Sequence, residues 1–291
     1  MLRYLALLLF AFAAVPAAAQ PAFTSERISV EVRGEGPDVV LIPGLSSHPQ
    51  VWESTIQALP GYRYHLVHVA GFAGKAPGAN ASGPVLVPVS EEIARYISEA
   101  RLDRPAIVGH SMGGSWALLV AGRNPGLVSR VMVVDMLPFI GAMFGGPTAT
   151  VESLRPVAEQ VRAGMASATP EARRAQIEQM MAGMIRTEAL RPRAIEQSLT
   201  SHPPTSAQGF HDLIVTDLRP EVARLAVPLT VLYTDPAGAP LTPARIDEFY
   251  RASYAGASQA VVRRVPDTAH FIMFDAPETF QRELREFLAT P

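Results

Sequence analysis

This chain of 291 residues lacks cysteine, contains a single lysine and carries almost no net charge. The absence of cysteine excludes a disulfide framework and a lipid-modified cysteine at the N-terminus. The 25 basic and 27 acidic side chains nearly cancel, so no basic excess points to nucleic acid or to an anionic membrane as a partner. Apart from Lys75, arginine supplies all the positive charge of these side chains, which together with abundant alanine and proline indicates a GC-rich bacterial coding sequence.

The first nineteen residues have the pattern of a secretory signal peptide. Arg3 provides a short basic region, and the uninterrupted apolar stretch over residues 5–15 is too short to span a bilayer. The alanines at 17–19 fit the small-x-small rule, which predicts cleavage between Ala19 and Gln20. The alternative is an N-terminal membrane anchor, which the short apolar stretch disfavours. We therefore expect a periplasmic or secreted protein without a stable membrane anchor after cleavage.

Short apolar runs alternate with helical segments along the rest of the chain. Continuous runs such as Val39–Ile42 and Val131–Val134 are typical of strands that are covered on both faces. Residues 28–32 instead alternate apolar with polar, as a half-buried edge strand does. This alternation of strands and helices predicts an α/β fold with a doubly wound, mainly parallel sheet. The expected strands are residues 28–32, 39–42, 64–69, 107–108, 131–134, 229–233 and 260–265.

Three helix starts carry capping signals. Ser90 can cap a helix with an apolar face, and Thr169 followed by Pro170 marks a second start. Asp275 with Glu278 three residues later resembles a capping box and predicts the start of the last helix.

The segment over residues 136–225 contains no strand-like run. Apolar residues recur there at helical spacing between Leu154 and Met165, and again between Ile177 and Ile185. Six of the ten methionines lie in this segment, either as ordinary helix packing or as the lining of an apolar substrate cavity under a mobile lid. The predicted organisation is a signal peptide at 1–19, an α/β core formed by 20–135 and 226–291, and a helical cap at 136–225.

The motif Gly-His-Ser-Met-Gly at 109–113 lies between a short apolar run and a helical stretch. On a strand-to-helix turn, Gly-x-Ser-x-Gly is the pattern of a nucleophile elbow, in which the serine is exposed on a sharp turn. Gly109 and Gly113 leave room for the strand and helix to approach each other. Taken alone, the motif also fits a polar turn residue. The functional interpretation makes Ser111 a nucleophile with the Met112 amide beside it.

A nucleophilic serine needs a base, and that base needs an acid to orient it. Of the seven histidines, His270 lies in a loop after the last expected strand, where it can reach the carboxyl ends of the parallel strands. Asp235 directly follows the strand at 229–234 and gives the chain order serine, aspartate, histidine. We therefore expect Ser111, Asp235 and His270 as the catalytic residues. Asp135, at the end of the preceding sheet strand, is the alternative acid.

The oxyanion that forms during acyl transfer needs backbone N–H donors. Met112 would supply one, and the loop after residues 39–42 should supply the other. Gly44 allows close backbone approach in that loop, so the Leu45 amide is the expected second donor. Ser46 or Ser47 could add a hydroxyl, or either could simply cap the next helix. The histidines are scattered along the sequence, so we expect no metal site, and the chemistry requires no cofactor.

Together these residues resemble the α/β-hydrolase family, in its serine hydrolase or esterase type with a helical cap. The resemblance spans nearly the whole mature chain. It is carried by residues 41–45 followed by Trp52, by residues 108–114, and by residues 265–273 continuing to Pro277 and Phe280.

Two departures from the family pattern are visible. Pro43-Gly44 replaces the His-Gly of many relatives, so the second oxyanion donor is assigned by position alone. Many relatives also place the acid two residues after Asp235, where this chain has Ala237. This displacement keeps Asp135 open as the acid.

The resemblance implies a hydrolase that uses a serine, a histidine and an acid and has a helical cap. Together with the signal-peptide pattern and the near-neutral charge, it leads us to expect an exported serine hydrolase that cleaves a carboxylic ester or a similar small acyl compound through an acyl-enzyme, without nucleic acid as a partner. The same catalytic residues could instead serve C–C bond hydrolysis, lactone hydrolysis or peracid formation, because fold does not determine function. A non-catalytic ligand-binding relative is a further alternative, which the displaced acid favours.

Overall fold

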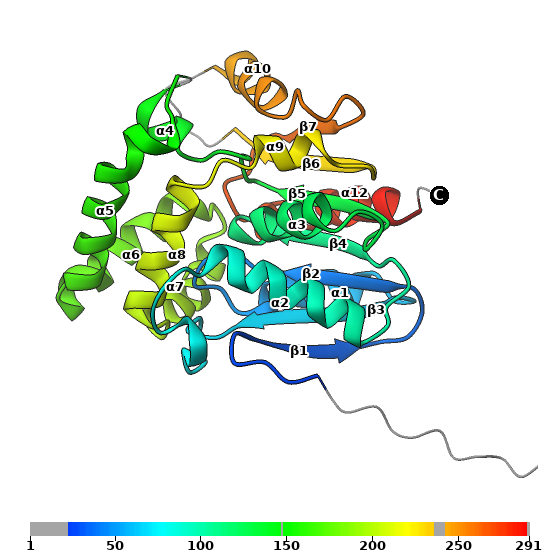
Figure 1. The fold of residues 1–291 in the computed structure, drawn as a ribbon, viewed down its shortest axis with the longest axis horizontal. Helices are drawn as coiled ribbons and strands as arrows, with labels where there is room; N and C mark the ends of the chain where they lie inside the picture. The colour runs from blue at the N-terminus through cyan, green and yellow to red at the C-terminus, as the bar shows by residue number, and fades with distance from the viewer. Residues whose placement is uncertain (1–22, 147, 236–241, 290–291) are drawn as a thin grey trace, which may run out of the picture.

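The computed structural model describes residues 23–146, 148–235 and 242–289. The predicted signal peptide and Ala237 lie outside the described residues. Within them a seven-stranded sheet has the order β1-β3-β2-β4-β5-β6-β7 (Figure 1). The strands are β1 Ile28–Arg33, β2 Asp38–Ile42, β3 Arg63–Val69, β4 Ala106–His110, β5 Arg130–Val134, β6 Leu229–Thr234 and β7 Val261–Val265. Only β1 pairs antiparallel, so the expected mainly parallel α/β sheet is confirmed.

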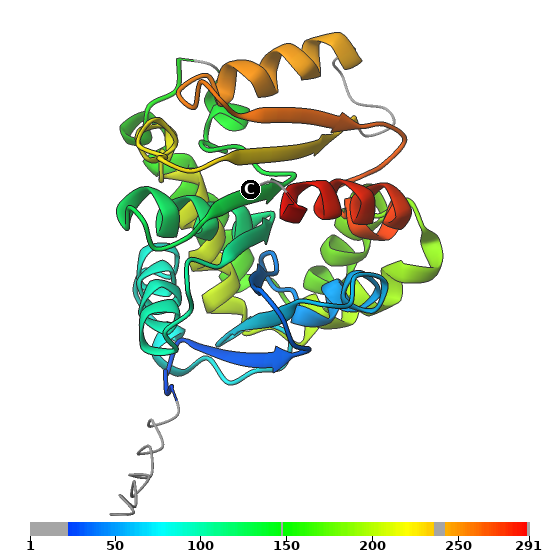
Figure 2. The ribbon, with the colours of Figure 1, turned by 90° about the vertical axis from the view of Figure 1, so that its right-hand side faces the viewer.

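Helices cover both faces of this sheet, as Figure 2 shows. Alternate residues of a strand point to opposite faces, so Val40 and Ile107 pack against one helical layer whereas Val39 and Val108 pack against the other. The helices outside the segment between β5 and β6 are η1 Pro49–Trp52, α1 Glu53–Ala58, η2 Gly78–Asn80, α2 Leu86–Glu99, α3 Met112–Arg123, α10 Pro243–Ser253, α11 Ile272–Asp275 and α12 Pro277–Ala289. α2 and α3 contribute to the first layer, and α12 contributes to the second.

The parallel register brings the loops that follow β2, β4 and β5 together at the edge of the sheet formed by the carboxyl ends of the strands. Gly109 of β4 pairs with Ile42 of β2 on one side and with Val133 of β5 on the other. The chain segments that follow these strands therefore leave the same edge side by side, which is where α/β proteins place their sites. Ser111 and Asp135 both lie at this edge.

Among the described residues between β5 and β6, all the regular elements are helices, and loops join them. These helices are α4 Ala142–Gly145, α5 Val151–Ser167, α6 Pro170–Met184, η3 Glu188–Leu190, α7 Arg191–Leu199, α8 Pro203–Ile214 and α9 Arg219–Ala223. α6 begins as predicted, because the Thr169 side chain accepts a hydrogen bond from the Ala172 amide. α9 packs on α3, where Glu221 contacts Gly122, so α9 lies with the core helices although the predicted cap range includes it. None of the described helices is long and apolar enough to cross a bilayer.

The methionines of this segment do not share one environment. Met181 is buried and packs with the partly buried Met184 in the second core layer. Met143 of α4 and Met180 of α6 are exposed. Ordinary packing therefore accounts for part of the methionine enrichment.

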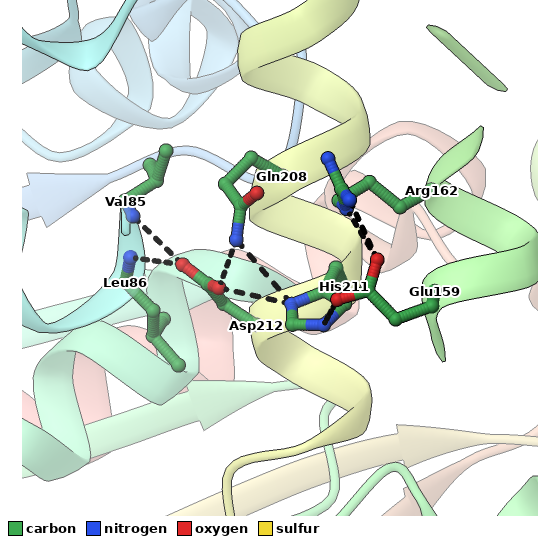
Figure 3. Close-up of polar contacts among 7 residues, drawn as sticks. All are labelled: Val85, Leu86, Glu159, Arg162, Gln208, His211 and Asp212. Carbon is green, nitrogen blue, oxygen red and sulfur yellow. Dashed lines mark hydrogen bonds and ion pairs between the residues drawn. The ribbon is translucent and has the colours of Figure 1, made fainter. Parts of the chain in front are cut away.

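The N-terminus of α2 is held by a side chain from α8 (Figure 3). The prediction that Ser90 caps this helix is wrong, because α2 already begins at Leu86 and the Ser90 hydroxyl donates to the Val87 carbonyl. The Val85 and Leu86 amides instead donate to Asp212 Oδ2, at 2.7 and 3.0 Å. A carboxylate stabilises the positive end of the helix dipole there, and it joins the cap to the core.

The other oxygen of Asp212 continues this contact into the cap (Figure 3). Asp212 Oδ1 accepts from Gln208 Nε2 at 2.7 Å and lies 3.3 Å from His211 Nδ1. His211 Nε2 lies 3.3 Å from a carboxylate oxygen of Glu159 on α5. A polar chain therefore links α5 through α8 to α2.

Candidate active site

Ser111 occupies a strained turn between β4 and α3. Its backbone has φ 53° and ψ −127°, a region that residues other than glycine rarely adopt. Its amide donates to the Val134 carbonyl at 2.9 Å, and its carbonyl accepts from Gly114 at 2.7 Å. The residue is only partly buried, and its hydroxyl has no hydrogen-bond partner in the described part of the chain. The turn therefore presents a free hydroxyl, as the motif predicts.

The two glycines of the motif are required by the closeness of three backbone segments. A β-carbon at Gly109 would lie 2.0 Å from the Gly113 carbonyl oxygen. One at Gly113 would lie 2.3 Å from the Ile42 carbonyl oxygen on β2. Both contacts are with backbone, which cannot rotate away as a side chain can.

Gly113→Ala should therefore lower the free energy of unfolding by about 3 kcal/mol, the upper end for forcing an extra carbon into a packed core. The matched control is Gly164→Ala on α5, because a β-carbon at Gly164 meets nothing within 4 Å. That change should raise stability by up to about 1 kcal/mol through helix propensity. Urea unfolding of both variants measures the difference, and equal effects would contradict the steric account.

His270 is held by Asp135. His270 Nδ1 lies 2.7 Å from Asp135 Oδ2, and both side chains are largely buried. Asp135 directly follows β5 and has φ 51°, a conformation that aspartate tolerates better than most residues. Because Nδ1–H donates to the carboxylate, Nε2 of the neutral ring is left as a proton acceptor.

Asp235 does not contact His270, which corrects the expected assignment of the acid. It follows β6 as predicted, but its Oδ2 accepts from Arg264 Nη1 at 2.5 Å. Arg264 lies on β7 opposite Tyr233, so its guanidinium reaches the end of β6 and pairs with this carboxylate. The alternative acid, Asp135, is the one that meets the histidine.

The loop that contains Leu45 lies directly against Ser111. A β-carbon at Gly44 would lie 2.9 Å from the Ser111 β-carbon, so only glycine permits this approach. The Leu45 amide has no hydrogen-bond partner among the described residues. Met112 is the first residue of α3, where amides have no partner within the helix. Gly209 of α8 lies close to the side chains of both Leu45 and Met112, and the role of their amides as oxyanion donors stays a prediction.

Ser46 neither caps a helix nor offers a free hydroxyl. Its Oγ lies 2.8 Å from Ser206 Oγ on α8. The His48 amide donates to Gln197 Oε1 on α7, and His48 itself caps η1. These contacts fasten the loop after β2 to the cap.

Comparison with known proteins identifies the family of this chain. A model described as the alpha/beta hydrolase family matches residues 39–283. The chain belongs to the α/β-hydrolase family. It is 28% identical over 252 residues to the pimeloyl-acyl-carrier protein methyl ester esterase of Edwardsiella ictaluri, covering 86% of this chain and 92% of that protein. The enzyme of the same name from Vibrio cholerae is 28% identical over 260 residues, covering 88% and 96%.

Solved structures show the same fold at lower sequence identity. The enol-lactonase from Burkholderia xenovorans LB400 aligns with a TM-score of 0.70 and 18% identity over 90% of this chain and 96% of that one. An esterase from Exiguobacterium antarcticum aligns with a TM-score of 0.72 and 21% identity, again covering 90% and 96%. The family model and the relatives named as esterases identify the protein as an enzyme of the α/β-hydrolase family, and ester hydrolysis fits this family.

In this α/β hydrolase His110 supports His270, the predicted base, a contact that the sequence did not suggest. His110 Nε2 donates to the backbone carbonyl of His270 at 2.9 Å, and the two ring centroids are 4.7 Å apart. Complete burial, with the nearby His270, holds the pKa of His110 well below its ordinary value. His110 therefore stays neutral and places no competing charge beside the base.

Asp275 also supports the segment that contains His270, rather than capping the last helix as predicted. Its Oδ2 accepts from the Ala269 amide at 2.9 Å and from the Arg186 amide at 3.2 Å. Its Oδ1 accepts from both the amide and the hydroxyl of Thr187, each at 2.9 Å. One carboxylate thus joins the segment before His270 to the cap after α6. The only feature of the sequence that could have indicated this contact is that Asp275 follows His270 by five residues.

Across the described residues, no group of three histidine, aspartate or glutamate side chains is arranged to hold a metal ion. His65 and His68 of β3 have separate partners. His65 lies between Asp38 and Tyr96, whereas His68 contacts the Phe72 carbonyl and the ring of His48.

Proposed function

We propose that this enzyme hydrolyses a carboxylic ester, or a similar small acyl compound, through a triad of Ser111, His270 and Asp135. The observation that carries the proposal is the 2.7 Å hydrogen bond between His270 Nδ1 and Asp135 Oδ2 at the edge where Ser111 presents its hydroxyl. The pairing is the one in which an acid fixes the imidazole tautomer, and we propose that the opposite ring nitrogen, Nε2, activates Ser111.

The steps follow from these positions. His270 Nε2 accepts the Ser111 proton as Oγ attacks the ester carbonyl, and Asp135 stabilises the imidazolium that forms. The Leu45 and Met112 amides bind the oxyanion, each contributing roughly 3–4 kcal/mol by analogy with measured oxyanion donors. His270 then protonates the leaving alcohol. Water attacks the acyl-enzyme, with His270 as the base, and releases the acid.

The ester class is supported by the curated relatives, whose names state methyl ester hydrolysis. The proposal does not extend to their acyl-carrier protein substrate. The cap between β5 and β6 lies against the loop after β2, and this contact supports the proposal that cap residues select the acyl group.

Export is part of the proposal and rests on the pattern of residues 1–19. Cleavage after Ala19 would deliver the enzyme to the periplasm or the medium. N-terminal sequencing of protein recovered from that fraction should then begin at Gln20, whereas an intact Met1 in the cytoplasmic fraction would contradict export.

Covalent labelling with a fluorophosphonate probe tests the assignment. Ser111 Oγ should displace fluoride and form a bond to phosphorus, and peptide mapping should find the adduct on Ser111 alone. Ser111→Ala is the control and should remain unlabelled while its circular dichroism is unchanged. A folded wild-type protein that is not labelled, or is labelled elsewhere, would reject the proposed nucleophile. A panel of esters of increasing chain length then measures the size of the acyl site.

A further inference from the structure

The second carboxylate oxygen of Asp135 is not free. While Oδ2 receives His270 Nδ1–H, Oδ1 lies 2.9 Å from the hydroxyl of Tyr250 and 3.3 Å from the Thr234 amide. Tyr250 lies on α10, 115 residues further along the chain. Three separate segments therefore direct a hydrogen-bond donor at one carboxylate.

The ring of Tyr250 is fixed by its neighbours. It stacks on the ring of Tyr233 from β6, with centroids 4.1 Å apart and planes at 14°. The Tyr233 hydroxyl donates in turn to Asp247 Oδ1 at 2.8 Å, which ties β6 to α10. The phenol is therefore held in place before any substrate binds, as a group that orients a catalytic residue must be.

The direction of this hydrogen bond is set by protonation. Burial, followed by the nearby Asp135 carboxylate, raises the pKa of Tyr250 well above its ordinary value. The phenol thus remains protonated and donates to the carboxylate, which as an ionised group can only accept.

We infer that Tyr250 is a positioning residue for catalysis, because its hydroxyl holds the Asp135 carboxylate with Oδ2 facing His270 and disperses its negative charge. The inference rests on the proposed triad. A hydrogen bond to a charged group is among the stronger ones, and here it acts on the residue that stabilises the imidazolium. Tyr250 touches neither the reacting atoms nor His270 in the structure.

Loss of the phenol has a predictable effect on pH dependence. Without it, the Asp135 charge is less dispersed and stabilises protonated His270 more strongly. The acidic limb of the kcat/KM profile, which reports ionisation of the free enzyme, should therefore move to higher pH. The other titratable groups near Asp135, His270 or Tyr250 remain unchanged in the variant. They are His110 of β4, Tyr233 of β6, Tyr254 directly after α10, and Asp275 of α11, which accepts from the Ala269 amide next to His270.

Tyr250→Phe tests the inference, and Tyr254→Phe is its matched control. Tyr254 follows the last residue of the same helix as its C-cap and is buried, but its hydroxyl donates to the Met136 backbone carbonyl at 2.6 Å rather than to Asp135. Tyr250→Phe should lower kcat about tenfold, corresponding to about 1.4 kcal/mol, with KM little changed. The loss of the hydrogen bond that keeps Asp135 Oδ2 facing His270 should outweigh the stronger charge on the carboxylate. The acidic limb of Tyr250→Phe should move upward, while that of Tyr254→Phe should stay in place. The inference would be overturned if the two variants had the same kcat and the same acidic limb of the kcat/KM profile.

Two further measurements separate positioning from a loss of folding. In an Asp135→Asn background, Tyr250→Phe should no longer slow fluorophosphonate labelling, because the group on which it acts is gone. An equal slowing in both backgrounds would overturn the inference. If Tyr250→Phe does not fold, 3-fluorotyrosine at position 250 can replace it, because it keeps the ring and makes the phenol a stronger hydrogen-bond donor. The acidic limb of the kcat/KM profile should then move to lower pH. An acidic limb that does not move would overturn the inference.

The labelling experiment also separates this inference from the proposed function. If the wild-type enzyme is labelled on Ser111 at the same rate as Tyr250→Phe, the proposed triad stands and the role of Tyr250 is rejected. If the wild-type enzyme is not labelled at all, both the proposed triad and the role of Tyr250 are rejected.

Discussion

Asp135→Asn should lower kcat on an ester substrate by about 10³- to 10⁴-fold, as expected when the acid of a serine–histidine pair loses its charge. Asparagine cannot accept Nδ1–H with a full negative charge, so His270 loses both the correct tautomer and the stabilisation of its cation. The fold should survive, because asparagine tolerates the positive φ of this position as well as aspartate does. Steady-state kinetics on a chromogenic short-chain ester, with thermal unfolding measured in parallel, gives the result.

Asp235→Asn is the matched control, since it makes the same chemical change at the acid that the chain order favours. Its carboxylate is paired with Arg264, so neutralising it should change kcat by no more than about threefold, less than 1 kcal/mol. Stability should fall slightly because the ion pair is lost. A larger kinetic loss in Asp235→Asn than in Asp135→Asn would return the acid role to Asp235.

Ser111→Ala and Ser111→Gly should each lower kcat by about 10⁶-fold, the loss seen when the nucleophile of a serine triad is removed. The two variants should nevertheless differ in stability. At φ 53° alanine keeps the backbone strain of serine, whereas glycine adopts this region readily and relieves a cost of order 1–3 kcal/mol. Because glycine also has a more flexible unfolded chain, we expect a net advantage of about 1 kcal/mol for Ser111→Gly over Ser111→Ala.

Chemical unfolding of these two inactive variants measures the strain stored at the turn. Gly109 is not a suitable site for the reverse experiment, because any β-carbon there meets the Gly113 carbonyl. Equal unfolding midpoints for Ser111→Ala and Ser111→Gly would contradict the account of a strained turn. Substantial ester turnover by either variant would contradict Ser111 as the nucleophile.

The sequence by itself determined the sheet and the nucleophile turn. Runs such as Val39–Ile42 are apolar at every position, and only a strand buried on both faces between helices accommodates such a run at this length. The glycines at 109 and 113 flank Ser111 because backbone sterics allow nothing larger. Both features are set by neighbours within a few positions of the chain or by the period of the strand, so the pattern of residues is enough to find them.

Only the tertiary structure decided which polar side chains meet. Asp235 and Asp135 both follow sheet strands. In the structure Asp235 pairs with Arg264, whereas Asp135 is hydrogen-bonded to His270. Tyr250 reaches the acid from α10 across 115 positions.

The capping of α2 follows the same rule. Ser90 fits the local signal for a helix start, but Asp212 from α8 satisfies the helix amides across 126 positions. A hydrogen bond between such distant residues leaves no local periodicity, because it depends on the packing of whole elements. The sheet could therefore be predicted from the sequence, whereas the partners of its catalytic and capping side chains are set by the three-dimensional contacts.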